Sequence, residues 1–308
     1  MRKTVLEAQA RRLDIFGLHC ALYELAFLES NARAIKTEQL WFAGNPAVEN
    51  FGLSLDSDSE AYPGRIDKAR ELTNRAVESA IQADNKESGA IWWENAGLRQ
   101  AAMGNFAEAR SNAASGLKLY PASQSVQIEA ALAYAMAGDA TQAQTLGRDL
   151  NKRYPLDTQI QSLWLPAVQA QIALNRRDAA DAIERLQKAL PPIEYGNIPF
   201  INQISCLYPT YIRGQAYLGA GQSKEAAAEF QKILDHSGLV SNCWTRALAR
   251  LGVARANALQ AKNSTGAHAD AARVRALAAY KDFLTLWKDA DPDIPIYKQA
   301  KAEYAKLE

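Results

Sequence analysis

The chain has 308 residues, 48% of them hydrophobic, and a mean hydropathy of -0.28, which is typical of a folded protein with an ample core. Its 35 basic and 34 acidic residues are mixed along the chain, and this balance argues against a broad nucleic-acid-binding surface and against a basic membrane-binding segment. No apolar run is long enough to cross a bilayer, and the first residues lack the apolar core of a signal peptide, so we expect no membrane insertion.

The first part of the chain predicts two helical hairpins, over residues 12–46 and 49–84. Apolar and small residues recur there at helical spacing, and Pro63-Gly64 predicts the turn of the second hairpin. The acidic run at 56–60 is interpreted as an exposed helix face.

The next part of the chain repeats itself. Segments 104–121 and 138–155 each begin with glycine and a polar residue, carry alanine five residues after that glycine, and end in Tyr-Pro. The matching residues of the two segments are 34 positions apart. A fixed period of this length predicts stacked supersecondary units, each made of a helix A, a turn and a helix B.

Small residues explain how the two helices of a unit approach each other. Gly97 lies inside a predicted helix A, where glycine costs roughly 1 kcal/mol relative to alanine. That cost is acceptable where the missing side chain lets helix B come close, and Ala109 is the small residue expected opposite it.

Capping residues and prolines also indicate where the predicted B helices begin and end. The pairs at 105/108 and 139/142 have the three-residue offset of a capping box at the start of helix B. Pro121 and Pro155 should end the two B helices, because proline cannot continue the helical hydrogen-bond ladder.

Clear repeats are predicted over 88–190, with a longer first helix in the third unit that Pro166 should kink. Segment 191–206 contains three prolines and several large apolar residues, and it predicts a long ordered loop packed on the solenoid. Repeats resume over 207–288, with a turn expanded at 262–266. A last amphipathic helix, 294–307, is expected to cover the open end of the stack.

At these positions the chain resembles the tetratricopeptide repeat (TPR) family. The resemblance is strongest over 88–156 and 207–238, and these residues match the family pattern: Trp93, Gly97, Gly104, Phe106, Ala109, Pro121, Gly214, Tyr217, Gly221, Ala226 and Phe230. It implies an all-α fold: a single α-solenoid over 1–308, a right-handed superhelix of about seven helical hairpins plus the C-terminal capping helix.

A closer resemblance concerns three runs, LYPTYIRGQAYLGAGQ (207–222), AAAEFQKILDH (226–236) and the segment 282–307. They look like the C-terminal TPR region of bacterial eukaryotic-like serine/threonine protein kinases. The kinase motifs themselves, HRD, DFG and a VAIK lysine, do not occur. The resemblance therefore implies a regulatory or scaffolding region without phosphoryl transfer, cytoplasmic as it stands or extracytoplasmic if it derives from a membrane-spanning kinase.

The sequence gives only weak support for metal, nucleotide or catalytic sites. Cys20, Cys206 and Cys243 are interpreted as small core residues, without a disulfide framework or a zinc site. Segment 219–224 lacks the Walker spacing and reads as a turn, and the acidic cluster 289–293 lacks the pattern of a calcium loop and reads as a solvated, N-capping linker before the last helix. The three histidines lie in no nucleophile motif. We therefore expect no cofactor, no metal and no enzymatic activity.

The TPR resemblance implies that helix A side chains line a concave groove for a protein or peptide partner. The corresponding residues are Glu94, Leu98, Ile128, Leu132, Met136, Tyr208, Tyr211 and Gln215. The lysine-asparagine carboxylate clamp of chaperone-tail binders is absent, so the groove should hold apolar anchors. Trp92 is a candidate stacking platform, whereas Trp93 is expected in the core. Two alternatives stay open: a sensor that binds a small molecule or short peptide in the groove, and a groove filled by the superhelix or by 191–206.

Overall fold

The computed structural model describes residues 2–187 and 206–308, and within them every regular element is a helix. The all-α prediction is therefore confirmed. No helix in these ranges is long and apolar enough to cross a membrane. The predicted loop 191–206 lies outside the described residues except for Cys206.

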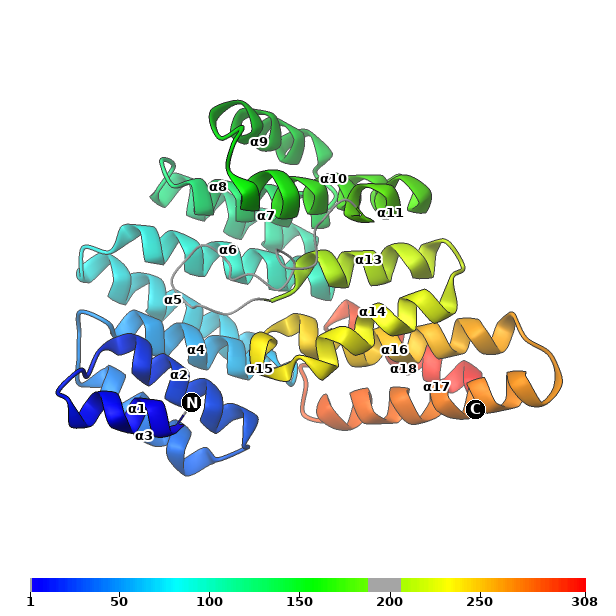
Figure 1. Cartoon of the computed structure of the whole chain (residues 1–308), viewed down its shortest axis with the longest axis horizontal. Coiled ribbons are helices and arrows are strands. Elements are labelled where there is room, and N and C mark those ends of the chain that lie inside the picture. The colour runs from blue at the N-terminus through cyan, green and yellow to red at the C-terminus, as the bar shows by residue number, and fades with distance from the viewer. Residues whose placement is uncertain (1, 188–205) are drawn as a thin grey trace.

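The helices form two arms that lie side by side (Figure 1). The N-terminal arm consists of α1 (Arg2–Ala10), α2 (Phe16–Leu28), α3 (Ala32–Ala43), α4 (Glu49–Ala61), α5 (Ile66–Gln82), α6 (Lys86–Met103), α7 (Phe106–Leu119), α8 (Gln124–Met136) and α9 (Ala140–Arg153). The C-terminal arm returns beside it through η1 (Ile160–Trp164), α10 (Leu165–Asn175), α11 (Ala179–Gln187), α13 (Tyr208–Gly219), α14 (Ser223–Asp235), α15 (Ser237–Val240), α16 (Trp244–Lys262), α17 (Gly266–Leu286) and α18 (Pro295–Leu307).

Neighbouring helices pack in a regular order. Contacts join α2 with α3, α4 with α5, α6 with α7, α8 with α9, α10 with α11, α13 with α14, and α16 with α17. The first helix of each pair also contacts the first helix of the next pair, from α4 through α6, α8, α10 and α13 to α16. The second helix of a pair also contacts the first helix of the next pair, as α5 contacts α6 and α7 contacts α8.

The small-residue contact within α6 and α7 is as expected. Ala109 is fully buried, and a side chain at Gly97 would lie 3.2 Å from the Ala109 carbonyl oxygen. Because that oxygen is backbone, it cannot move aside as a side chain could, so the two helices approach this closely only with glycine at 97.

Of the two helix caps predicted at 105/108 and 139/142, the structure contains one. Asp139 accepts a hydrogen bond from the backbone N–H of Gln142 at 3.1 Å and caps α9. Asn105 instead donates to Gln100 Oε1 at 2.7 Å, so it makes no side-chain cap on α7. The chain stops being helical just before Pro121 and Pro155, as predicted.

A π-helical segment, η1, immediately precedes the Pro166 turn of α10. Asp157 caps the segment by accepting from the Ile160 N–H at 2.9 Å. The wider π turn absorbs the extra residues of this unit before proline begins the regular helix. The predicted long helix thus has an irregular segment just before Pro166, where the chain passes from one arm to the other (Figure 1).

The two arms are also joined at the turn between α4 and α5. Trp287 Nε1 donates to the Tyr62 carbonyl oxygen at 3.0 Å, the Asp291 N–H donates to the Gly64 carbonyl at 3.0 Å, and Asp291 Oδ2 accepts from the Asp67 N–H at 2.8 Å. The acidic linker 289–293 thus caps α5, which is distant in sequence, whereas α18 has no side-chain cap.

The C-terminal helix does not only cover the end of the stack. α18 contacts α17 and also α6, in the middle of the opposite arm. Gly104, in the turn after α6, has a φ of +92°, and a side chain there would meet the Pro295 ring at 2.9 Å. The expectation of a simple end cap was therefore incomplete, because α18 bridges the arms.

The acidic run 56–60 is not an exposed face. Ser57 is buried, the other four residues are half-buried, and several of them pair with side chains from other helices. The sequence expectation was wrong because it judged polarity along one helix and could not see which partners would face it.

The cysteine interpretation is also corrected. Cys206 and Cys243 form a disulfide across 37 residues, with their Cα atoms 5.7 Å apart, and only Cys20 is a free buried thiol among the described residues. The bond joins the entrance of α13 to that of α16. The wide spacing of the cysteines in the sequence had argued against pairing. In the fold, α13 and α16 contact each other, which brings the starts of the two helices together.

We expect Ala109→Leu to lower the free energy of unfolding by roughly 1–3 kcal/mol, because the added atoms would force α6 and α7 apart. Ala114→Leu, on the exposed side of the same helix, is the control. The measurement is thermal denaturation followed by circular dichroism. An unchanged melting temperature would contradict the packing of α6 on α7.

We expect reduction of the Cys206–Cys243 disulfide to destabilise the protein by about 2–4 kcal/mol, because reduction restores the entropy of the unfolded chain. The melting temperature is measured with and without a phosphine reductant, and a Cys206→Ser/Cys243→Ser variant should not respond to it. A thiol titration of the unreduced, denatured protein that finds three free thiols would show that no disulfide forms.

Candidate functional site

The residues predicted to line the groove are gathered on the inner side of the two arms, but most are buried. Leu98, Ile128 and Leu132, from α6 and α8, are at most 1% exposed. Tyr208 and Tyr211, from α13, are 5% exposed. At these residues the inner face is therefore covered, and a peptide cannot reach it in this state of the molecule.

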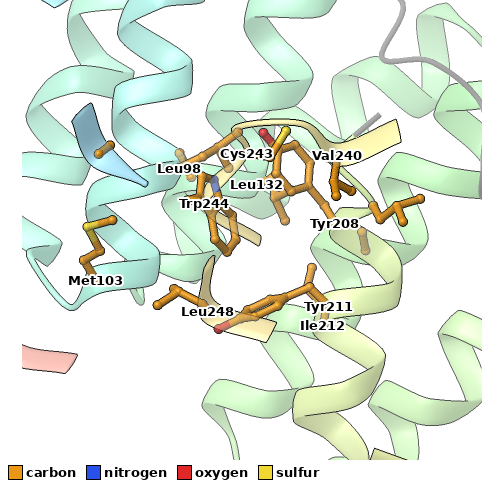
Figure 2. Close-up of a cluster of buried hydrophobic side chains, with 14 of the residues drawn as sticks. Leu98, Met103, Leu132, Tyr208, Tyr211, Ile212, Val240, Cys243, Trp244 and Leu248 are labelled. Carbon is orange, nitrogen blue, oxygen red and sulfur yellow. The ribbon is translucent and has the colours of Figure 1, made fainter. Parts of the chain in front are cut away.

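Trp244, at the start of α16, packs against the two tyrosines of this face (Figure 2). Its ring stacks on Tyr208 with centroids 5.5 Å apart and meets the edge of Tyr211 at 5.1 Å. Leu98 and Leu132 belong to the same cluster. Sequence reasoning missed Trp244, because its contacts are with α13, which lies more than 30 positions earlier in the chain.

The remaining groove candidates differ in exposure. Met136 and Gln215 are half-buried, and the Gln215 amide donates to the Tyr211 hydroxyl at 3.1 Å. Trp92 is buried, donates to Asn50 Oδ1 at 3.1 Å and meets the edge of the Phe51 ring, so it is a core residue and not a stacking platform. Trp93, expected in the core, is the more exposed of the two.

Two carboxylic acids are buried behind the inner face without hydrogen-bond partners. Neither oxygen of Glu94 has a partner, and Glu129 Oε2 has none. Glu94 packs so closely on α7 that a side chain at Gly116 would collide with it. Burial, together with the charge of Glu129, raises the pKa of Glu94 well above its usual range, and burial raises the pKa of Glu129 to about 8.

Aromatic side chains near Glu129 also carry unused polar atoms. The Tyr208 ring lies between Trp164, 5.8 Å away, and Trp244. The indole nitrogen of Trp164 lacks an acceptor. Burial and then the negative charge of Glu129 raise the pKa of Tyr208 well above its usual range. Buried donors and acceptors without partners are uncommon in folded proteins, which makes this region a candidate for a small polar ligand or ordered water.

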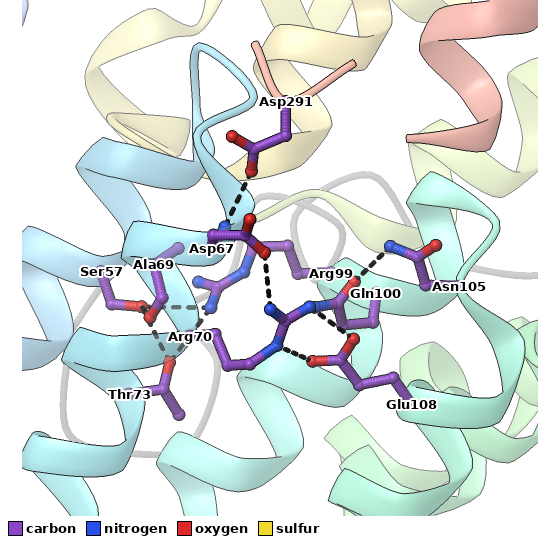
Figure 3. A network of polar contacts seen from close by, with 10 residues as sticks. All are labelled: Ser57, Asp67, Ala69, Arg70, Thr73, Arg99, Gln100, Asn105, Glu108 and Asp291. Carbon is purple, nitrogen blue, oxygen red and sulfur yellow. Dashed lines mark hydrogen bonds and ion pairs between the residues drawn. The ribbon is translucent and has the colours of Figure 1, made fainter. Parts of the chain in front are cut away.

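A polar network behind the predicted acidic face holds Arg99 (Figure 3). Arg99, 3% exposed, donates to Asp58 at 2.7 Å and to Ser57 and Thr73 at 3.1 Å each. Ser57 in turn donates to the Ala69 carbonyl oxygen at 2.7 Å. These bonds join α4, α5 and α6, and a buried, paired arginine of this kind is structural.

A second part of the network lies near the start of α5, where the two arms are joined. Arg70 of α5 donates to both oxygens of Glu108 on α7, at 2.6 and 2.8 Å, and to Asp67 at 2.6 Å (Figure 3). Asp291 reaches the same place. The charges here are paired with one another, so they fix the arms and offer little to an external ligand.

An open groove lies on the outside of the chain, where the arms meet. It has a volume of about 440 Å³ and runs between α9, α10 and α11. Its lining consists of Ala143, Gln144, Gly147, Arg148, Asn151, Leu165, Val168, Gln169, Ile172, Arg176 and Arg185. The spacing of these residues places one face of α9 and one face of α10 opposite each other. The sequence analysis did not find this groove, because it depends on how the π-helical turn redirects α10.

Apolar side chains form the floor of this groove and arginines its rim. Leu165, Val168 and Ile172 are almost fully buried, so they sit at the base. At Gly147 an added side chain would touch only Leu165, at 3.5 Å, so space is available above this glycine. A concave site with an apolar base and a few polar groups is the usual form of a binding site.

No family model matches the chain, and no curated protein matches it either.

We expect the stability of the protein to fall as the pH rises from 5 toward 8. Glu129 has a folded pKa of about 8 and an ordinary value of 4.5, so the folded state keeps a proton that the unfolded state releases. The unfolding free energy therefore decreases with pH in this window, by up to about 1.4 kcal/mol per pH unit for each such carboxyl. Urea denaturation at pH 5, 7 and 9 measures this slope.

Glu129→Gln should flatten the slope, and Glu78→Gln, on the exposed side of α5, should leave it unchanged. Equal slopes for the wild type and Glu129→Gln would show that this carboxyl is ionised in the folded protein at neutral pH.

Proposed function

We propose that the chain is a non-enzymatic TPR-type α-solenoid that binds a segment of a partner protein in the groove between α9, α10 and α11. The observation that carries the proposal is the groove itself: it is open, it has an apolar floor, and it lies on rigid helices. The predicted groove residues of the inner face are buried, which leaves the outer groove as the better site for a peptide in this state.

The repeat order supports the solenoid interpretation. Helices of each pair contact each other, and the first helices form a continuous inner row. The turns after α6, α8 and α13 use Gly104, Gly138 and Gly221 with positive φ, as the 34-residue pattern requires. The relation to the regulatory region of a bacterial serine/threonine kinase remains part of the proposal and rests on the runs in 207–307.

The disulfide bears on where such a module works. Disulfides persist in oxidising compartments and are uncommon in the reducing cytosol. The Cys206–Cys243 bond therefore favours the extracytoplasmic alternative over the cytoplasmic one.

A second function has an observation of its own. The unpartnered atoms of Trp164 and Glu129 favour a sensor that encloses a small polar molecule near Tyr208. A bound mass in native mass spectrometry that Glu129→Gln removes would support this function in place of the first.

The test of the first function is a selection from a phage-displayed library of random peptides, about 16 residues long or ~24 Å as a helix. Gly147→Leu should weaken the selected peptides about tenfold or more, because a leucine fills the groove above Leu165 and removes roughly 1.4 kcal/mol of binding. Ala114→Leu adds an exposed leucine on α7 and should have no effect. If no selected peptide depends on residue 147, the groove is not the binding site.

A further inference from the structure

The groove between α9, α10 and α11 carries charge of one sign. Three arginines line it, and no aspartate or glutamate does. The chain as a whole has a net charge of only +1, so this grouping departs from the average surface.

Two of these arginines are available to a ligand. Arg148 of α9 is exposed and has no hydrogen-bond or ion-pair partner in the described ranges. Arg176, after α10, uses only its Nε, toward the Ile172 carbonyl oxygen at 3.5 Å, so its terminal nitrogens have no partner there either.

The third arginine is fixed in place. Arg185 of α11 lies 2.9 Å from Asp181 and donates to Gln169 at 2.8 Å. These bonds hold its guanidinium at the rim while it keeps unused N–H groups. The rim thus combines one preorganised cation with two that are free to adjust, and guanidinium groups bind carboxylates through paired hydrogen bonds.

Two acids that are close in sequence to these arginines make contacts of their own. Asp149 pairs with Arg153 on α9, and Asp178 caps α11 through the Asp181 N–H at 3.0 Å. Among residues 2–187 and 206–308, no carboxylate forms an ion pair with Arg148 or Arg176.

We infer that the groove takes an acidic segment of a partner protein, in which an apolar side chain rests on Leu165, Val168 and Ile172 while aspartate or glutamate carboxylates pair with Arg148 and Arg176. This inference rests on the proposed function and names the chemistry of its partner. The apolar floor favours a peptide over a nucleic acid, because a phosphate backbone offers no side chain to fill the floor. The small volume, about 440 Å³, limits the contact to a few side chains.

Two fluorescein-labelled peptides test the inference, each about 14 residues long or ~21 Å as a helix. Both carry two leucines four positions apart, and they differ in having four glutamates or four glutamines. Fluorescence anisotropy with the full chain should show the glutamate peptide binding about tenfold more tightly at low salt. This preference should shrink as salt is raised from about 50 to about 300 mM, because salt screens exposed charges.

Variants assign the effect to the groove. Arg148→Ala/Arg176→Ala should bring the two affinities within about twofold of each other, because only the charged pairs are removed. Arg33→Ala, an exposed arginine on α3, is the control and should change neither affinity. A labelled single-stranded oligonucleotide of matched charge should bind no better than the glutamine peptide.

Each failure has a distinct meaning. If both peptides bind equally and Gly147→Leu weakens both, the groove binds peptides but the acidic preference is wrong. If neither peptide binds and the display selection also yields no groove-dependent peptide, the proposed function is wrong as well. If the oligonucleotide binds as tightly as the glutamate peptide, the partner is not defined by carboxylates and the inference is overturned.

Discussion

The structure depends on one contact, the packing of the C-terminal arm against the inner face of the N-terminal arm. Trp244 and Tyr208 supply large apolar surfaces, and burial of an aromatic side chain of this size is among the largest single contributions to a core. The hydrogen bonds of Trp287 and Asp291 join the same arms at the α4–α5 turn. Because the inner row of helices is covered in this way, its polar members, Glu94 and Glu129, are enclosed without partners, and open binding surface remains on the outside.

The sequence predicted the helices well, because their signals are local. Glycine with positive φ at 104 and 138, proline after the B helices, and small residues at 97 and 109 each act within one pair of helices, and each was found where expected. These features can be read from a single chain because the residues that make them lie within one repeat.

The site was predicted poorly, because it depends on contacts between distant repeats. Leu98 and Leu132 were expected to face a groove, and whether that groove is open depends on Trp244, more than 100 positions later. The half-buried acids at 56–60 and the Cys206–Cys243 bond were misjudged for the same reason. The arginine-lined groove was missed because Arg148, Arg176 and Arg185 come together only where the π-helical turn changes the direction of the chain.

The bonds from Trp287 to Tyr62 and from Asn242 to Leu55 have a consequence for folding. A linear repeat array contacts only its neighbours, so its ends can unravel separately and it can begin to fold anywhere. Here residues about 190 to 225 positions apart touch, which raises the contact order and slows the search for the native state. During synthesis the early helices must wait for the last third of the chain before their inner surface is covered. Once the arms have met, the middle of the N-terminal arm and the C-terminal arm hold each other, and these parts should unfold together.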